Sequence, residues 1–461
     1  MNRAWLLRPL VLLLALTLAG WLTPPLAGAQ APAEPTPRLP SPVAGRILSL
    51  KEAIDIALEN QPSIQARLGD YAAARQRVDQ AFSGLLPQIG GSWTAARDQI
   101  ASIHRSRGKL GGIAFNDWRT TSESRATLSQ LLWDFGKTVA ATDKEKANAE
   151  SSKEDVEVDR NDTVLLVKES YFNLLFGKRL VAVNQEAVVR AELNLRSAKG
   201  FFEVGTRPKF DVTRAEVDLA NAQLTLIQAR NAVRLARVAL NTAMGISIGS
   251  PTEVEDILSY EAFPVDESRL LPEALQRRPE YRQIKVKVEA AEASVRQTFR
   301  DFFPDVKGNA KYGFDRAEAE VKPGGQTLTA DFVEVWELGV TLNWSIFDGG
   351  NKIAKYKEAK ASLEAAQSRV RVQELAIWKE VEQAHLNVIE SEERIQAAKK
   401  AVEAARENFR LAQGRFDAGV GTIIELTDAQ LALTQALSTE AQALTDYRIG
   451  VSRLERALGR R

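Results

Sequence analysis

The most regular pattern along the chain is a seven-residue repeat of apolar positions in its last quarter. The large members of the repeat are Val381, Val388, Ile395, Val402, Phe409 and Phe416. Small side chains follow three residues after the first five of them, at Ala384, Ser391, Ala398, Ala405 and Ala412. Because small residues let a neighbouring helix approach closely, the repeat predicts a left-handed coiled coil. The Ser391 hydroxyl is expected to bond back to a carbonyl one turn earlier and to leave the pattern intact.

All of these positions except Phe416 lie in a long helical stretch, residues 351–414, that contains no Pro and no Gly before its last residue. At 1.5 Å per residue the helix would be roughly 96 Å long. Residues 137–199 have a similar length and predict a matching long helix. His385 falls within the coiled-coil pattern, and we interpret it as a helix-packing residue rather than a ligand.

A pair of glycines follows the long helical stretch at residues 351–414. Gly419 and Gly421 precede Thr422, a residue type that favours helix N-caps, so residues 415–430 predict a helix hairpin, the second tip. A similar segment, residues 200–216, lies 214 positions earlier and predicts a first tip. The matching pairs are Gly200/Gly414, Phe202/Phe416, Gly205/Gly419, Thr213/Thr427 and Ala215/Ala429. Pro208 suits the first turn of a return helix that runs to about residue 244, and a C-terminal helix follows the second tip.

The match between the tips belongs to a longer internal repeat, with residues 47–265 as its first copy and 266–461 as its second. Near the start of each copy the offset is 217, as in Ala57/Ala274, Leu58/Leu275, Pro62/Pro279 and Pro87/Pro304. From Asp134/Asp348 onward the offset is 214. One small gap therefore separates two matching stretches, which predicts a duplication. Helices are expected at 48–86 and 270–302, and a lateral connection rich in Gly, Pro and acidic residues at 245–264.

Each copy also contains two stretches of alternating polarity, which predict strands near residues 88–100, 122–133, 305–315 and 333–347. We expect residues 102–121 between the first two to form a polar loop, with His104 solvated. The clearest apolar face belongs to the fourth strand, and its members are Trp336, Leu338, Val340, Leu342, Trp344 and Ile346. Its two tryptophans would be about 26 Å apart along a strand. That is close to the height of the lipid-facing band on an outer-membrane barrel, although a soluble hairpin packed on helices would also alternate.

Four strands are too few to close a barrel, and open strand edges are not tolerated in lipid. If these strands span a membrane, several copies of the chain must pool them. Three copies would supply twelve strands, an even number within the range seen for such barrels.

The N-terminus predicts export. Residues 1–29 combine Arg3 and Arg8, an apolar core at 10–19 and a small-residue cleavage pattern ending at Ala29, as in a signal peptide. A transmembrane anchor is less favoured, because the core is short and Pro24 and Pro25 follow it. Residues 30–46 are rich in Pro and predict an extended tail. The mature protein is therefore expected outside the cytoplasmic membrane.

Composition removes several classes of function. The chain has 61 Lys and Arg against 60 Asp and Glu, so no nucleic-acid partner is indicated and no class of cargo is favoured. It has no Cys and only two His, which argues against thiolate or histidine metal sites, and no cofactor is expected. There is no phosphate-binding loop and no nucleophile–base signature, so an enzyme is not indicated. After the N-terminus no long apolar run predicts a membrane-spanning helix.

Several short motifs, taken in order, resemble those of the TolC-like outer-membrane efflux proteins. They are Leu50-Lys51-Glu52-Ala53-Ile54, Asn60-Gln61-Pro62, Leu85-Leu86-Pro87-Gln88, Leu132-Trp133-Asp134-Phe135-Gly136, Ile346-Phe347-Asp348-Gly349-Gly350 and the two tips. The resemblance covers residues 48–458, nearly all of the mature chain. It implies a homotrimer with four strands per chain in one outer-membrane β-barrel and a periplasmic tunnel of antiparallel coiled-coil helices. It also implies work with a periplasmic adaptor protein and an inner-membrane transporter, in drug or metal efflux or type I secretion.

The resemblance also assigns a periplasmic gate. The family's constriction carboxylates fall on Glu425 and Asp428, with Asp211 in the first tip, where a ring of them would favour cations. Phe416 takes the family's aromatic position and Gly421 its Arg position, so the family's latch is not reproduced there. Our hypothesis is that Arg207 or Arg214 pairs with Glu425 or Asp428 instead. The adaptor contact would fall on Val204, Gly205, Thr206, Gly419, Val420 and Gly421, although the glycines also serve the turns.

The alternative interpretation from a different class is a periplasmic coiled-coil scaffold or adaptor without a pore. The strand from Trp336 to Ile346 discriminates between them, because it would face lipid in a channel and pack on protein in a scaffold.

Overall fold

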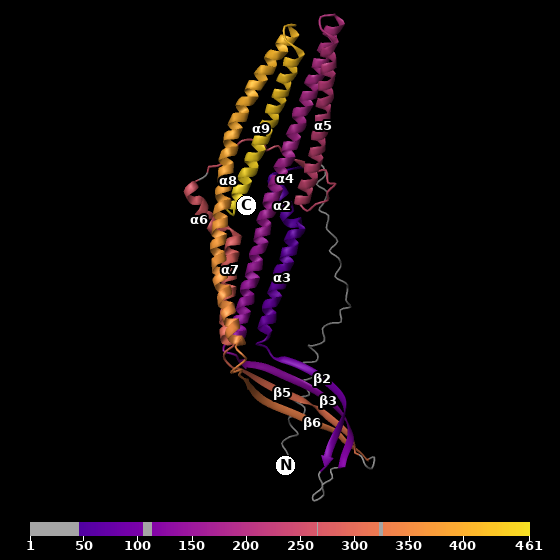
Figure 1. Cartoon of the computed structure of the whole chain (residues 1–461), viewed down its shortest axis with the longest axis vertical. Helices are drawn as coiled ribbons and strands as arrows, with labels where there is room; N and C mark the ends of the chain where they lie inside the picture. The colour runs from indigo at the N-terminus through magenta and orange to yellow at the C-terminus, as the bar shows by residue number, and fades with distance from the viewer. Residues whose placement is uncertain (1–45, 105–112, 265, 322–325) are drawn as a thin grey trace.

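The computed structural model describes residues 46–104, 113–264, 266–321 and 326–461. The predicted signal peptide and nearly all of the predicted tail lie outside the described residues. The chain is mostly helical and elongated, with long helices at one end and a sheet at the other (Figure 1). Among the described helices, none is both long and apolar enough to cross a membrane.

Two long helices form the frame of the molecule, α4 (Lys137–Glu203) and α8 (Asn351–Asp417), each of 67 residues. Each follows a glycine in the left-handed conformation, and the preceding aspartate caps it: Asp134 Oδ2 accepts from the Thr138 N–H at 2.7 Å, and Asp348 Oδ2 from the Lys352 N–H at 3.1 Å. The predicted ends at residues 199 and 414 are too early, because the helices continue through Gly200 and Gly414 into the tips.

Shorter helices pair with these two. They are α2 (Leu50–Asn60), α3 (Pro62–Ser83), α5 (Lys209–Ala243), α6 (Glu267–Arg277), α7 (Pro279–Arg300) and α9 (Ile423–Ala457). The prediction of one helix over 270–302 is wrong. The backbone is extended at Arg278, with ψ of 124°, because a residue before proline avoids the helical region. The same break falls at Gln61, before Pro62, and α5 starts directly after Pro208, which is its N-cap.

The helices contact one another in a fixed order. Toward the tips the order is α5, α4, α9 and α8, and toward the sheet it is α3, α4, α7 and α8 (Figure 1). The two main apolar cores lie at the equator, the level where α2 meets α3, α6 meets α7, and α5 and α9 end. Here β1 (Ile47–Leu48) pairs in parallel with β4 (Glu253–Val254) in the connection after α5.

The predicted coiled-coil side of α8 is buried. Val381, Ile395 and Phe416 are nearly inaccessible, and the Ser391 hydroxyl donates to the Asn387 carbonyl at 2.6 Å, as predicted. His385 is also buried within α8.

The sheet is antiparallel, with the order β2 (Gln88–His104), β3 (Ile113–Trp133), β5 (Asp305–Val321) and β6 (Gln326–Asn343). Three strands are longer than predicted, because backbone pairing continues past the alternating segments; most of the expected loop at 102–121 is strand. The fourth prediction is wrong at its end: β6 stops at Asn343, and Trp344 and Ile346 follow it. The Trp344 indole N–H donates to the Phe302 carbonyl at 3.1 Å.

Candidate gate at the helical tips

The two tips are similar turns between a long helix and a short one. Gly205 and Gly419 have φ of +78° and +79°, a conformation that favours glycine. In the second tip the Thr422 hydroxyl accepts from the Glu425 N–H at 3.2 Å, which confirms the predicted N-cap.

An apolar centre joins the two tips. Phe416, Ile423 and Leu426 of the second tip are almost completely buried, and Phe201 and Phe409 pack against them. The rings of Phe201 and Phe416 meet edge to face, with centroids 5.8 Å apart. Because Phe201 comes from α4 and Phe416 from α8, this cluster holds the first tip against the second.

Arg207 forms the main polar bridge between the tips. Its Nη2 donates to the Gly421 carbonyl at 2.6 Å, and its guanidinium lies 4.5 Å from the centre of the Phe416 ring. Its Nη1 lies 3.4 Å from Oδ2 of Asp211, whose side chain is 8% exposed. An aromatic ring, an arginine and an aspartate therefore meet here, with the arginine supplied by the first tip.

Gly421 permits this bridge through its lack of a side chain. Its N–H donates to the Arg415 carbonyl at 2.8 Å, which closes the turn tightly. A Cβ at this position would lie 2.9 Å from the Phe416 nitrogen, closer than real contacts allow. The tight turn leaves the Gly421 carbonyl available to Arg207.

The hypothesis that Arg207 or Arg214 pairs with Glu425 or Asp428 is wrong within the chain. Each arginine instead pairs with an aspartate one turn later on α5, Arg207 with Asp211 and Arg214 with Asp218. Helical spacing of four residues brings these partners together without any contact between tips. Glu425 pairs with Arg415 at 3.6 Å, and exposed Asp428 forms no ion pair among the described residues.

A second bridge was not predicted from the sequence. The Thr427 hydroxyl of α9 donates to Asp218 of α5 at 2.8 Å. In the sequence, Thr427 is distinguished only as the repeat match of Thr213, and Asp218 only as the residue four positions after Arg214. The expected adaptor-contact residues lie at the turns, where Val204 and Val420 are each 71% exposed.

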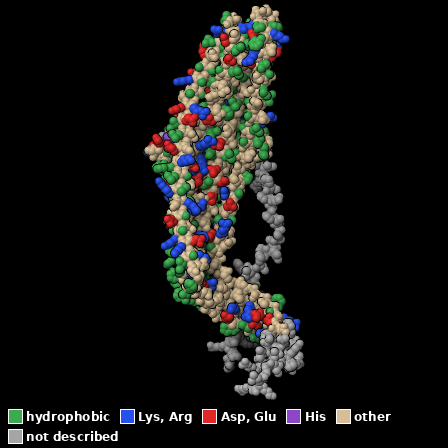
Figure 2. Space-filling model, viewed as in Figure 1, with side chains coloured by type: hydrophobic (Ala, Val, Ile, Leu, Met, Phe, Trp, Pro, Cys, Tyr) green, Lys and Arg blue, Asp and Glu red, His purple; other side chains and the backbone are tan. Residues whose placement is uncertain are grey.

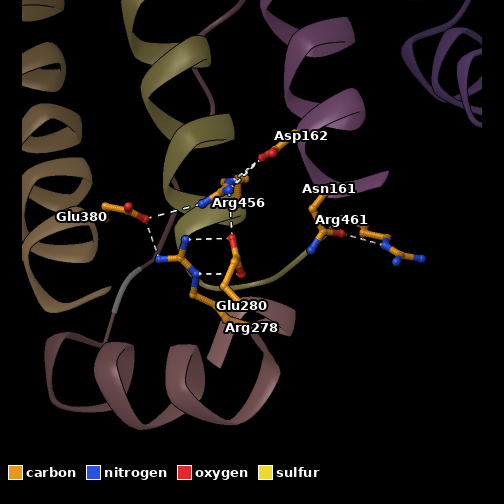
Figure 3. A network of polar contacts seen from close by, with 7 residues as sticks. All are labelled: Asn161, Asp162, Arg278, Glu280, Glu380, Arg456 and Arg461. Atoms are coloured by element: carbon orange, nitrogen blue, oxygen red, sulfur yellow. Dashed lines mark hydrogen bonds and ion pairs between the residues drawn. The ribbon is translucent and has the colours of Figure 1, made fainter. Parts of the chain in front are cut away.

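A network of charges at the equator was also missed (Figure 3). The Arg278 side chain is 2% exposed and pairs with Glu280 at 3.1 Å and Glu380 at 2.6 Å. Arg456 joins Glu280 at 2.8 Å to Asp162 at 2.7 Å, so the network ties α7, α8 and α9 to α4. Burial opposes the charge on Glu280, but the hydrogen bond from Arg278 and the charges of Arg278 and Arg456 outweigh it and lower its pKa.

On the face of the molecule shown in Figure 2, basic and acidic side chains are interspersed over the helical part. In the described part of the chain, no group of His, Asp or Glu is arranged to hold a metal ion.

Sequence comparison decides the family. The profile of the family described as outer membrane efflux protein matches residues 53–246 and 270–460. The chain belongs to the outer membrane efflux protein family. The two matched segments correspond to the two copies of the predicted repeat, and the break between them falls in the lateral connection.

Individual relatives within the outer membrane efflux proteins are distant in sequence, but each match covers most of both chains. The alkaline protease secretion protein AprF of Pseudomonas aeruginosa is 25% identical over 419 residues, 88% of this chain and 83% of its own. The outer membrane protein TolC of Escherichia coli is 25% identical over 422 residues, 89% and 82% of the two chains.

Solved structures show the same fold. The outer-membrane channel OprN has a TM-score of 0.74 at 20% identity, with 89% of both chains covered. The CmeC outer membrane channel of Campylobacter jejuni has a TM-score of 0.74 at 18% identity, with 89% and 85% covered. The protein is thus a TolC-like outer-membrane channel component of an efflux or type I secretion system, in a family of channels rather than enzymes.

Proposed function

We propose that three copies of this chain form one passive exit duct, with a twelve-stranded barrel in the outer membrane and a helical tunnel across the periplasm. The observation that carries the proposal is the sheet with two bare edges, β2 and β6, beside a row of uncovered apolar side chains. Trp336, Leu338 and Val340 on β6 are each at least 70% exposed. Pairing of edge strands between copies removes both edges, and lipid covers the row.

The internal duplication is part of this proposal. The bounds of α6 and α7 fall at the repeat positions that match those of α2 and α3, and the bounds of α8 and α9 match those of α4 and α5 in the same way. Three chains would therefore contribute six similar units around one axis. The sheet follows the same division, because β2 and β3 precede α4 whereas β5 and β6 precede α8.

The tips act in this proposal as the periplasmic gate. Arg207 holds the first tip to the second through Gly421 and Phe416, and this contact keeps the entrance narrow. Exposed Glu425 and Asp428 would line the entrance and favour cations. Val204 and Val420 would contact a periplasmic adaptor protein, which links the duct to an inner-membrane transporter.

The relatives' names span two kinds of cargo, with a protease secretion protein and a toluene efflux pump protein among them. The duct itself performs no chemistry in either system. Specificity would therefore come from the transporter, in drug or metal efflux or in type I secretion.

Reconstitution into planar lipid bilayers tests the proposal against the alternative of a periplasmic scaffold. Purified trimers should insert and give discrete, long-lived current steps. A protein that stays monomeric, remains soluble without detergent and carries no current would be a scaffold or adaptor.

A further inference from the structure

A strained aromatic residue lies where the sheet meets the helices. Phe135, between β3 and α4, has φ of +56°, in the left-handed region that favours glycine. In the described part of the chain it is the one residue other than glycine with such a φ. Its repeat counterpart is Gly349, with φ of +71°. Because glycine forms the same turn without strain, the outlier indicates that the Phe135 ring has a role of its own.

The Phe135 ring belongs to a row of exposed aromatic side chains. It stacks on Phe303, just after α7, with ring centroids 5.0 Å apart, and meets Trp133 edge to face at 5.9 Å. Phe303 in turn meets Phe299 of α7 at 5.7 Å. All four rings are 42–61% exposed. We call Trp133, Phe135, Phe303 and Phe299 the aromatic row.

The aromatic row begins on the face of the sheet that is proposed to meet lipid. Trp133 lies opposite Val306, and Val306 lies opposite Leu342. Directly opposed residues of neighbouring strands point to the same face, so Trp133 shares the apolar face of Leu342. The aromatic row therefore continues this face from the sheet onto the end of α7. It is complete within one chain, because β3 contacts β5 and α4 contacts α7.

A cation lies at the helical end of the aromatic row. Arg300, the last residue of α7, is partly buried, and its Nη1 donates to the Gly136 carbonyl at 2.6 Å. A Cβ on Gly136 would lie 2.9 Å from this nitrogen, so the guanidinium rests on bare backbone directly after Phe135. Within the described residues, no carboxylate pairs with Arg300. A partly buried arginine in this state is suited to an anionic ligand, and its planar fork matches phosphate.

A polar cavity adjoins the aromatic row and Arg300. Its volume is about 210 Å³, and its lining includes Phe303, Arg300, Lys137 and Asp301. The Lys137 ammonium lies 2.5 Å from Oδ1 of Asp301. The cavity thus offers two cations to a phosphate and a carboxylate to an ammonium, next to an exposed ring.

The internal repeat shows that the fold does not require this combination. The counterparts of Phe135, Phe303, Arg300 and Lys137 are Gly349, Leu86, Ser83 and Asn351. The equivalent positions therefore carry neither a ring nor a cation. Since all four positions differ together, the combination indicates one ligand site in each chain.

We propose that the aromatic row, Arg300 and Lys137 bind one glycerophospholipid per chain, with its acyl chains along the aromatic row and its phosphate at the two cations. The order along the molecule is that of the lipid itself: apolar sheet face, rings, then cations. Aromatic rings are favoured at this boundary between hydrocarbon and headgroups. A phosphoethanolamine headgroup fits the cavity best, because its ammonium complements Asp301. This inference rests on the proposed membrane position of the sheet and adds a bound lipid at its periplasmic end.

Lipid titration of the purified, delipidated channel tests the proposal. With added phosphatidylethanolamine, native mass spectrometry should show one retained lipid per chain, and the unfolding temperature should rise with lipid concentration. Arg300→Gln/Lys137→Gln should weaken binding about tenfold to a hundredfold, because charged hydrogen bonds to the phosphate are lost. Lys146→Gln is the control and should leave the affinity unchanged, because Lys146 is 62% exposed further along α4. Equal affinities of the two variants would overturn the phosphate site.

Phe135→Gly separates lipid binding from folding. Because Gly349 forms the same turn, the unfolding temperature without lipid should change little, whereas the lipid affinity should fall about fivefold with loss of the stacked ring. Leu86→Ala, at the position equivalent to Phe303 and 47% exposed, should leave the affinity unchanged. If Phe135→Gly unfolds earlier but binds lipid as tightly as the unmodified chain, the ring is structural and the proposal is wrong.

Two further measurements distinguish the remaining outcomes. Glycerol phosphate, which has no acyl chains, should bind about a hundredfold more weakly than the lipid, because apolar contact is missing. Equal affinity would mean a site for free phosphate and would overturn a lipid site. Bilayer currents of the same preparations test the duct separately. A conducting channel whose lipid affinity is the same in every variant refutes only the lipid site, whereas absence of trimers and currents refutes the duct itself.

Discussion

Each half of the chain has an arginine at a position where the other half has a different residue, and the two arginines lie at different levels of the molecule. The first half has Arg207 at its tip and Gln61 at the equator, whereas the second half has Gly421 and Arg278 at the equivalent positions. The Gln61 side-chain amide donates to the Ala243 carbonyl at 3.3 Å, whereas the Arg278 side chain is buried among carboxylates. The difference indicates that the second half is anchored at the equator, and that the first half supplies the side chain that bridges the tips.

The largest expected effect comes from replacing Arg278 by glutamine, the residue at the equivalent position 61 of the first half. Arg278→Gln leaves Glu280 and Glu380 without their buried partner, and breaking such a pair costs about 3 kcal/mol. Amides at the start of α7 and the end of α9 should then exchange with solvent about a hundredfold faster. Hydrogen exchange with mass spectrometry measures this. Arg277→Gln is the control, because Arg277 is 54% exposed and its loss should change exchange less than about fivefold; equal effects would show that the network does not anchor the second half.

A smaller effect is expected from adding a side chain at Gly421. Gly421→Ala forces the turn apart, at a cost of about 1–2 kcal/mol, because its Cβ meets backbone atoms. The Gly421 carbonyl then moves away from Arg207, and closed-state current should rise about tenfold. Gly414→Ala in the same tip has open space around it and should leave the current unchanged. If the two variants behave alike, the carbonyl bridge does not hold the gate.

Acid and alkaline pH should each destabilise the equatorial part of a different half of the chain. Near neutral pH neither half should be affected. The pKa of Glu280 is lowered from 4.5, so its contribution is present above pH 4.5 and is lost as pH falls through the lower folded value. In the first half, burial is the main cause that raises the pKa of Tyr171 from 10.0 to about 12. The Tyr171 hydroxyl donates to the Leu48 and Glu255 backbone carbonyls. These hydrogen bonds should persist below pH 10 and be lost near pH 12.

Hydrogen exchange, corrected for its intrinsic pH dependence, should therefore show loss of protection first in α7 and α9 on acidification, and first in β1 and β4 at alkaline pH. Loss of protection in the same order at both extremes would remove the distinction between the halves.

Much of the fold could be predicted because its signals are local and repeated. Heptads indicated α8, the similar length of residues 137–199 indicated α4, a pair of glycines located the second tip, and the internal repeat located the first. The strands were predicted too short, because alternation ends before pairing does. The breaks at Gln61 and Arg278 could have been inferred from Pro62 and Pro279, because a residue before proline avoids the helical region.

The polar contacts of the site could be predicted less well. The sequence indicated that Gly421 replaces the arginine of the family's latch. It could not indicate that the Gly421 backbone carbonyl accepts a hydrogen bond from Arg207, because every residue has a backbone carbonyl. Nothing in the sequence singled out Arg278, and only the packing of four helices shows that it is buried. Glu425 and Asp428 at the second tip are exposed, and their role in a gate stays a prediction. The nearer aspartates on α5 pair with both arginines instead.

The most direct test of the account compares the closed-state conductance of Arg207→Ala and Arg415→Ala in planar bilayers. Arg207 makes a partly buried, charged hydrogen bond worth about 1.5–3 kcal/mol, so its loss should raise the closed-state conductance about tenfold to a hundredfold. Arg415 forms an exposed pair worth at most about 1 kcal/mol, so its loss should raise it less than about fivefold. An unchanged conductance in Arg207→Ala, or a larger effect of Arg415→Ala, would contradict the claim that Arg207 closes the gate.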